Sequence, residues 1–287
     1  MARTGGVIAT AAFLGVATVA VLWGPALYSS FTASPPSNQC TVSTPIAHYS
    51  RSAERTDNVA IIAAVGWVNG FDEKGVTIAV TTAIQESGLR NLNYGDRDSV
   101  GLFQQRASQG WGTVEQIMDA RYSATMFYTA LGKVNGWENL RVTEAAQAVQ
   151  RSGFPEAYAS HEAEGRAWAN ALGGVEGTVS CELTAPDVTT ARAFSDRVAL
   201  DFPGAGFAVE VLESDGNTTV LGIKPTDATD QSLRRLQSWA IATASTTGAE
   251  WADLRGSRWT RNGTWQQSNP TQQWANYPGI RVAVRTS

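Results

Sequence analysis

The sequence predicts an α+β protein in which a mainly helical region is followed by a small α/β region. Apolar residues recur at helical spacing between residues 54 and 174. Beyond Cys181 the pattern changes to short alternating runs typical of strands, around two further helices. A long apolar segment precedes both regions. With 287 residues, of which 43% are hydrophobic, the chain can bury one large core or two ordinary ones.

Residues 1–30 are expected to form an export signal or a transmembrane anchor. Val7–Leu27 has no charged side chain and follows a single basic residue, Arg3. A helix needs about 20 apolar residues to span a bilayer, and this segment reaches that length. The basic residue in front of it favours a cytoplasmic N-terminus, with the remainder outside. We therefore expect an extracytoplasmic protein, membrane-anchored or secreted, with cleavage left undecided.

Residues 31–53 are expected to be a linker, because Phe31–Pro45 is rich in Ser, Thr and Pro and has no charge. The chain has two cysteines, Cys40 and Cys181. In an exported chain an even pair is most simply a disulfide, and this one would enclose the whole helical region.

The helical region, residues 54–180, is expected to hold several helices separated by a polar loop. In the first helix, Val59, Ile62, Val65 and Val68 recur at helical spacing, and Gly70 ends it. The second helix is apolar on most sides and should be buried. The turn-rich loop spans residues 91–99. The expected helices are 54–70, 73–86, 113–133, 143–152 and 155–172.

Residues 181–287 are expected to form a separate, non-catalytic α/β domain. Its expected strands are 208–212, 220–223 and 280–284, with helices near 189–201 and 231–247.

Glu86 is the strongest candidate for chemistry, because it ends an otherwise apolar helix just before Gly88. Burial raises the pKa of a carboxyl, which suits a general acid acting on a glycosidic oxygen. Shortly afterwards, Gln104 and Gln105 supply amides that can hydrogen-bond sugars without adding charge. The alternative interpretation of Glu86 is an ordinary helix-terminal carboxylate paired with Arg90.

Two motifs in this order carry a family resemblance. Glu86-Ser87, followed by Gly-Leu-Phe-Gln at 101–104, resembles the Glu-Ser and Gly-Leu-Met-Gln motifs of soluble lytic transglycosylases and goose-type lysozymes, with Phe103 replacing methionine. Residues 85–112 are similar to a group of secreted actinobacterial proteins. The resemblance implies a lysozyme-like domain that acts on peptidoglycan, with Glu86 as acid/base and Gln104 lining the glycan site. The expected substrate-binding residues are Ser87, Tyr94, Gln104, Gln105 and Trp111.

One departure from that family weakens the prediction of activity. The family carries Ala-Tyr-Asn-Ala-Gly on a later helix, where the corresponding segment here is 148–152 and has no tyrosine. Tyr158 or Tyr94 are candidates to replace it. The competing hypothesis is a catalytically silent protein that binds or organises the cell wall.

A second carboxylate would be needed by a double-carboxylate glycosidase, and Asp96 and Asp98 are the candidates. Asp in a polar loop more often shapes a turn. If neither faces the cleft, an intramolecular attack that forms an anhydro-sugar would need only one acid.

Other partners and cofactors are not expected. The net charge of -4 argues against nucleic-acid binding. The C-terminal region vaguely resembles domains related to zinc D,D-peptidases, but the only histidines, His48 and His161, lie outside it. We therefore expect no metal and no cofactor, while protein partners stay unknown.

Overall fold

The computed structural model of the chain describes residues 37–269, 274 and 276–286. The predicted signal or anchor, residues 1–30, lies outside these residues. Among the residues that are described, no helix combines the length and apolar character needed to cross a membrane. Residues 38 onward group into one compact unit, which has mixed α+β structure.

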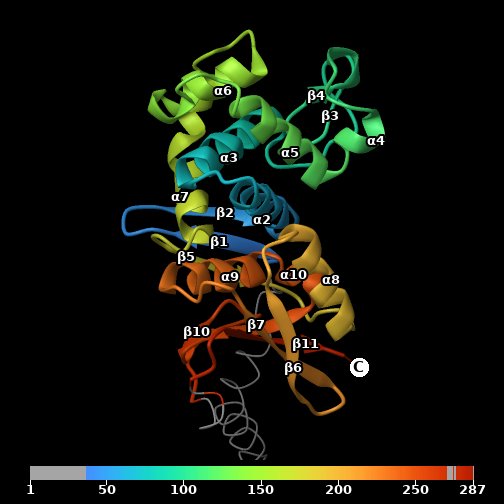
Figure 1. The fold of residues 1–287 in the computed structure, drawn as a ribbon, viewed down its shortest axis with the longest axis vertical. Coiled ribbons are helices and arrows are strands. Elements are labelled where there is room, and N and C mark those ends of the chain that lie inside the picture. Colours follow the sequence, from blue (N-terminus) through green and yellow to red (C-terminus); the bar gives the residue numbers. More distant parts are fainter. Residues whose placement is uncertain (1–36, 270–273, 275, 287) are drawn as a thin grey trace, which may run out of the picture. The chain divides into compact units, whose positions relative to one another are not determined.

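A small antiparallel sheet lies between the helical region and the C-terminal region (Figure 1). It consists of β1 (Gln39–Ser43), β2 (His48–Ser52) and β5 (Thr178–Glu182), in the order β2-β1-β5. The prediction of a linker over residues 31–53 is therefore wrong for 39–52. The linker was predicted from composition, which does not reveal this strand: β1 buries only Cys40 and Val42, and it is stabilised by pairing with β5, which is distant in the sequence.

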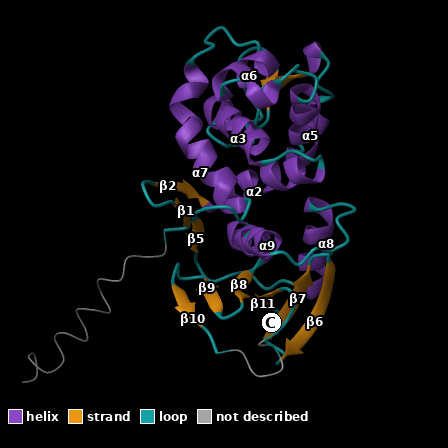
Figure 2. Ribbon diagram, turned by 60° about the vertical axis from the view of Figure 1, so that its left-hand side comes forward, coloured by secondary structure: helices purple, strands orange, loops and turns teal. Residues whose placement is uncertain are grey.

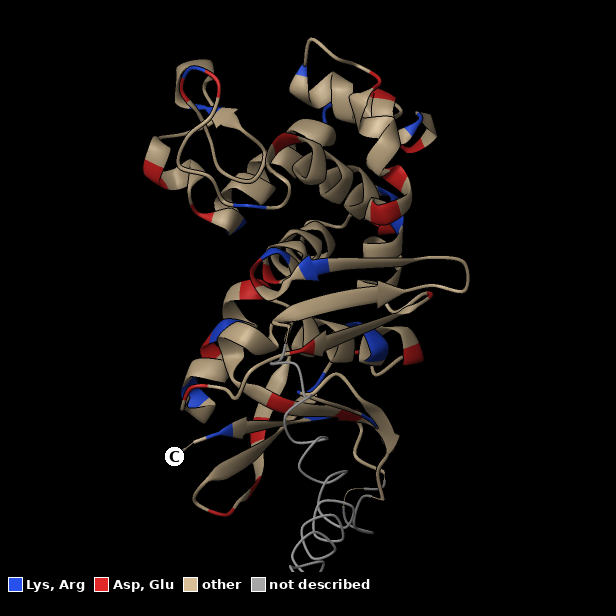
Figure 3. Ribbon diagram, turned by 180° about the vertical axis from the view of Figure 1, so that it is seen from behind, with Lys and Arg blue, Asp and Glu red and all other residues tan. Residues whose placement is uncertain are grey.

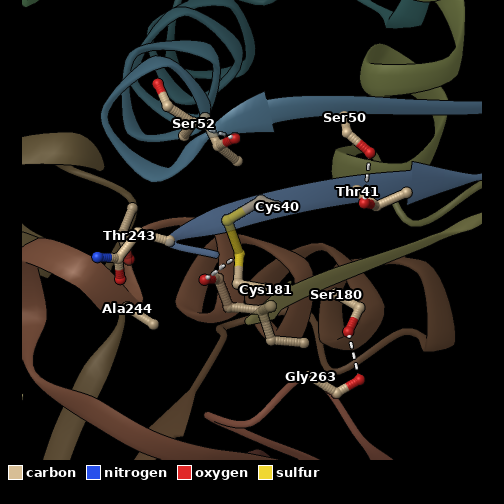
Figure 4. Close-up of a disulfide and its surroundings, with 12 residues drawn as sticks. Cys40, Thr41, Ser50, Ser52, Ser180, Cys181, Thr243, Ala244 and Gly263 are labelled. Carbon is tan, nitrogen blue, oxygen red and sulfur yellow. Dashed lines mark hydrogen bonds between the residues drawn. A yellow bond between two sulfur atoms is a disulfide. The ribbon is translucent and has the colours of Figure 1, made fainter. Parts of the chain in front are cut away.

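The predicted disulfide is confirmed between Cys40 and Cys181, 141 residues apart. The two residues are directly opposed in the antiparallel register of β1 and β5 (Figure 4). Both are buried, and the Cys181 sulfur lies 3.3 Å from the carbonyl oxygen of Ile241 on α9. The disulfide thus joins the two ends of the helical region beside a helix of the C-terminal region.

The helical region follows the predicted order with two differences. The single helix expected over 113–133 is two helices, because Asp119 caps the second by accepting from the backbone N–H groups of Arg121 and Tyr122. The helix expected from 155 begins as a 3-10 turn. The elements are α2 (Ala53–Val68), α3 (Glu73–Ser87), β3 (Ser99–Val100), β4 (Gln105–Arg106), η1 (Ala107–Gln109), α4 (Val114–Ile117), α5 (Ala120–Leu131), η2 (Trp137–Asn139), α6 (Val142–Gln150), η3 (Ala157–His161) and α7 (Glu162–Leu172).

Helix α3 is buried at the centre of this region and packs against α2, α6 and α7 (Figure 2). Its contact with α7 is close, because a Cβ atom built at Gly165 would lie 2.2 Å from the Thr81 hydroxyl oxygen. Asp72 caps the start of α3, and Gly88 ends it in the left-handed conformation. The helix that carries Glu86 is therefore held on several sides.

The C-terminal region is a six-stranded sheet with helices on one face, in the order β10-β9-β8-β11-β7-β6. Its pairs are all antiparallel among the described strands, so this region is α+β rather than the predicted α/β. The predicted boundary at residues 180 and 181 falls inside β5. The elements are α8 (Ala191–Asp201), β6 (Ala208–Ser214), β7 (Thr218–Lys224), α9 (Asp230–Ala242), α10 (Ala244–Thr247), β8 (Ala249–Leu254), β9 (Ser257–Thr260), β10 (Trp265–Gln267) and β11 (Ile280–Arg285).

A buried ionic network joins the two regions. Asp201 on α8 accepts from Arg121 Nε at 2.8 Å and from Trp239 Nε1 at 2.8 Å. Arg197 binds both Asp201 and Asp57 of α2. Burial raises the pKa of Asp57, while the Arg197 charge opposes that increase. These mostly buried ion pairs link α2 and α5 to α8 and α9, and they attach the C-terminal region to the helical one.

Candidate active site

Glu86 lies in the last turn of α3, where Gly88 and then Leu89 turn the chain away in left-handed conformations. The preceding residues Ala83 and Ile84 are buried, and Glu86 itself is half-buried. Within the described residues it forms no ion pair, which argues against the predicted alternative of a pair with Arg90. Burial raises the pKa of Glu86 above its ordinary value, as expected from its position.

Tyr158 donates a hydrogen bond to Glu86 Oε1 at 2.7 Å. This tyrosine is on η3 and is fully buried, and burial followed by the bond to Glu86 raises its own pKa. Of the two tyrosines considered from the sequence, Tyr158 therefore lies beside the acid. Tyr94 is 64% exposed on its loop. The sequence offered Tyr158 and Tyr94 as alternatives but could not choose between them, because Tyr158 comes from a different element than the tyrosine of the family motif.

Gln150, at the end of α6, is a site residue that the sequence analysis missed. Its Nε2 donates to the carbonyl oxygen of Phe103 at 2.8 Å, and its side chain also lowers the pKa of Glu86, after Tyr158 and against the larger effect of burial. It belongs to the segment 148–152 that lacks the expected tyrosine. The glutamine in this segment, Gln150, was the only sign there that an amide side chain could lie near Glu86.

Ser87 and Gln105 were expected to bind substrate, but both are buried, at 4% and 2% exposure. The Ser87 hydroxyl donates to the carbonyl oxygen of Leu102 at 2.8 Å. Gln105 Nε2 donates to the carbonyl oxygen of Ser123 at 3.0 Å. These bonds hold the Gly-Leu-Phe segment against α3 and α5, so the two side chains position the site and reach no surface where a glycan could bind.

Gln104 is only partly buried, and its amide is turned toward the preceding loop. Its Nε2 lies 3.4 Å from the Tyr94 carbonyl oxygen and 3.3 Å from that of Gly101. A Cβ atom at Gly95 would lie 2.7 Å from the Ser99 carbonyl oxygen, a backbone atom, and would also displace the Gln104 amide, so a glycine is needed there. Gln104 thus braces the 94–101 loop.

Neither candidate for a second carboxylate is hydrogen-bonded to Glu86. The Asp96 side chain is 89% exposed. Asp98 accepts from the Ser108 backbone N–H at 2.9 Å and from Arg106 Nε at 2.7 Å. These bonds, the first more than the second, hold the pKa of Asp98 well below its usual range. A carboxylate bound in this way is a weak base and serves to brace the loop, which is the turn-shaping alternative.

A cavity of about 690 Å³ opens next to Gln150. It is bounded by the loop at Trp111, by α5 and the turn after it at Lys133, and by the end of α6 at Gln150 and Arg151. Trp111 is partly buried and packs against the core. Gln150 belongs both to this wall and to the surroundings of Glu86, and it is the residue that links the cavity to the acid, which does not itself line the cavity.

Within the described part of the chain, no three His, Cys, Asp or Glu residues come together as metal ligands would. The site contains one partly buried carboxyl, Glu86, in contact with the Tyr158 hydroxyl and next to the Gln150 amide. No protein-family model and no curated protein sequence matches the chain.

Proposed function

We propose that the protein cleaves the glycan strands of peptidoglycan, with Glu86 as general acid. The observation that carries this proposal is the contact between Tyr158 and Glu86 Oε1, at 2.7 Å, on a carboxyl whose pKa burial raises. A raised pKa keeps the proton on the carboxyl to higher pH than in an ordinary glutamate, and the tyrosine fixes the direction in which the carboxyl presents it. A helix-terminal carboxylate with a purely capping role would require neither.

The single acid favours formation of an anhydro-sugar over hydrolysis. In the first step Glu86 gives its proton to the glycosidic oxygen as the bond from that oxygen to the anomeric carbon breaks. The sugar's own C6 hydroxyl then attacks the anomeric carbon, and the Glu86 carboxylate takes the released proton, which restores the acid. Asp96 is exposed and Asp98 is bound to Arg106 and Ser108, so neither is offered as a base.

The proposed location is outside the cytoplasm. The disulfide between Cys40 and Cys181 favours an oxidising compartment. Membrane attachment through residues 7–27, or secretion, belongs to the proposal, as does the lysozyme-like assignment of residues 54–180. We propose peptidoglycan as the partner and assign the C-terminal region no catalytic role.

The test is incubation of the protein with purified peptidoglycan, followed by mass analysis of the released fragments. Glu86→Gln keeps the size and hydrogen-bonding capacity of the side chain but removes its transferable proton, so we expect release to fall by about 10²- to 10⁴-fold. The matched control is Glu54→Gln, an exposed carboxylate in the first turn of α2. Fragments one water lighter than hydrolysis products would support the anhydro route.

Comparable release by wild type and Glu86→Gln would show that the acid lies elsewhere. If wild type releases nothing yet binds peptidoglycan, the wall-binding scaffold becomes the better account.

A further inference from the structure

The cavity beside Gln150 has an uneven charge. Its charged wall residues are Lys133 and Arg151, and no acidic side chain lines it. Over the described ribbon as a whole, basic and acidic residues are interspersed (Figure 3), and the full chain carries a net charge of -4. The presence of two basic residues, Lys133 and Arg151, in the wall of one cavity is therefore a local feature that the net charge of the molecule does not predict.

Both cations lack protein partners among the described residues. Lys133 and Arg151 are exposed, and neither side chain forms an ion pair or hydrogen bond there. Other basic residues of the same region are paired, such as Arg106 with Asp98 and Arg141 with Glu144. An unpaired cation in a concave site is available to a bound anion, and the attraction is stronger there than on a flat surface.

A structural explanation accounts for part of this arrangement. Lys133 follows the end of α5 and Arg151 is the C-cap of α6, where positive charge is favourable next to the helix carbonyls. That effect operates at the last turn of each helix separately. It does not require both side chains to line the same cavity, whose wall also contains Trp111 and Gln150.

We propose that this cavity binds a carboxylate carried by the glycan strand and thereby orients the strand at Glu86. The inference rests on the proposed function for its substrate, since it names the acidic group that the strand would present. Two sources share this chemistry: the peptide attached to the strand, and the lactyl group of the sugar once that peptide is removed. Trp111 supplies an aromatic surface in the same wall, suited to a sugar ring or an apolar part of the substituent.

The experiment measures binding, so that it stands apart from cleavage. The full-length protein carrying Glu86→Gln is titrated with three oligosaccharides of matched length: peptide-bearing strands, strands treated with an amidase, and a neutral chitooligosaccharide. Lys133→Gln and Arg151→Gln are compared with Arg192→Gln, a highly exposed arginine on α8. Two independent variants keep the test valid if one fails to fold.

We expect each cavity substitution to weaken binding of carboxylate-bearing strands by about twofold to fivefold, with the effect shrinking at high salt. Binding of the neutral oligosaccharide and binding by Arg192→Gln should not change. A loss confined to peptide-bearing strands identifies the peptide as the source, and a loss with amidase-treated strands identifies the lactyl group. Equal losses on the neutral oligosaccharide, or no loss on any strand, would overturn the proposal. Selective binding without cleavage by wild type would defeat only the proposed function.

Discussion

Tyr158→Phe isolates the hydrogen bond to Glu86 with the smallest change of shape. The substitution removes one hydroxyl from a fully buried ring and leaves its packing in place. In the native protein this bond stabilises the ionised carboxyl, so it opposes the effect of burial on the pKa of Glu86. Its loss should therefore raise the pKa of Glu86 further.

The expected loss of stability depends on pH. A hydrogen bond to a charged acceptor contributes about 1.5 to 3 kcal/mol, while one between neutral groups contributes about 1 kcal/mol. Tyr158→Phe should accordingly lower the free energy of unfolding by the smaller amount at acid pH, where Glu86 is protonated. The deficit should approach the larger amount as the pH rises and Glu86 ionises in the native protein.

The activity profile should move in the corresponding direction. Because the protonated acid starts the reaction, kcat/KM should fall as the pH rises through the pKa of Glu86. In Tyr158→Phe this alkaline fall should occur at higher pH than in wild type. The assay is fragment release measured across pH, together with denaturant unfolding of both proteins.

The control is Tyr128→Phe, a buried tyrosine whose hydroxyl donates to the carbonyl oxygen of Ile62 at 3.0 Å. It should lose about 1 kcal/mol of stability without moving the activity profile. An unmoved profile in Tyr158→Phe, or the same movement in both variants, would refute the role assigned to Tyr158.

Four further outcomes are expected. Replacing Cys40 and Cys181 together by serine should destabilise the fold by about 5 kcal/mol on the loop-entropy model, as measured by denaturant unfolding. A thiol titration of the unreduced wild-type protein should find no free thiol. Asp98→Asn should hardly affect glycan release, and a large loss would instead indicate a second catalytic carboxylate. Because the folded pKa of Asp98 is lowered, its contribution to stability is present at neutral pH and lost as the pH falls, so the stability deficit of Asp98→Asn should shrink below about pH 4. Asp201→Asn should lower the free energy of unfolding by about 1.5 to 3 kcal/mol, because it removes the charged acceptor of Arg121 and one of the two carboxylate partners of Arg197, which keeps Asp57; unchanged unfolding would contradict the role of the network. Metal analysis of the full-length protein should find no stoichiometric zinc.

Local sequence pattern was sufficient for the helices and for the position of Glu86. The apolar residues of α2 and α3 recur at helical spacing, and Asp72, Gly70 and Gly88 mark where these helices begin or end. Caps and periodicity act between neighbours in the chain, so they can be recognised without the tertiary structure. The raised pKa of Glu86 followed from the apolar character of the same helix.

The strands of the small sheet could not be predicted in this way. β1 and β2 have few apolar residues; β1 is stabilised by pairing with β5 and by the disulfide between Cys40 and Cys181, and β2 by pairing with β1. Strand formation depends on such distant partners more than on local preference. The same reason explains why a domain boundary was expected at a residue that lies inside β5.

The roles of the side chains around Glu86 were decided by tertiary packing. The motif identified Ser87 and Gln105 as ligand contacts, yet both are buried and bind backbone carbonyl oxygens of neighbouring segments. Tyr158 reaches the acid across 72 residues of sequence, and Gln150 lies in a segment where another residue type was expected. The sequence by itself determined which carboxyl is buried at the end of a helix, because that depends on local pattern. Only the folded chain decided which tyrosine and which amide lie beside it, and which cations line the cavity at Gln150, because those contacts join segments that have no local relation to one another.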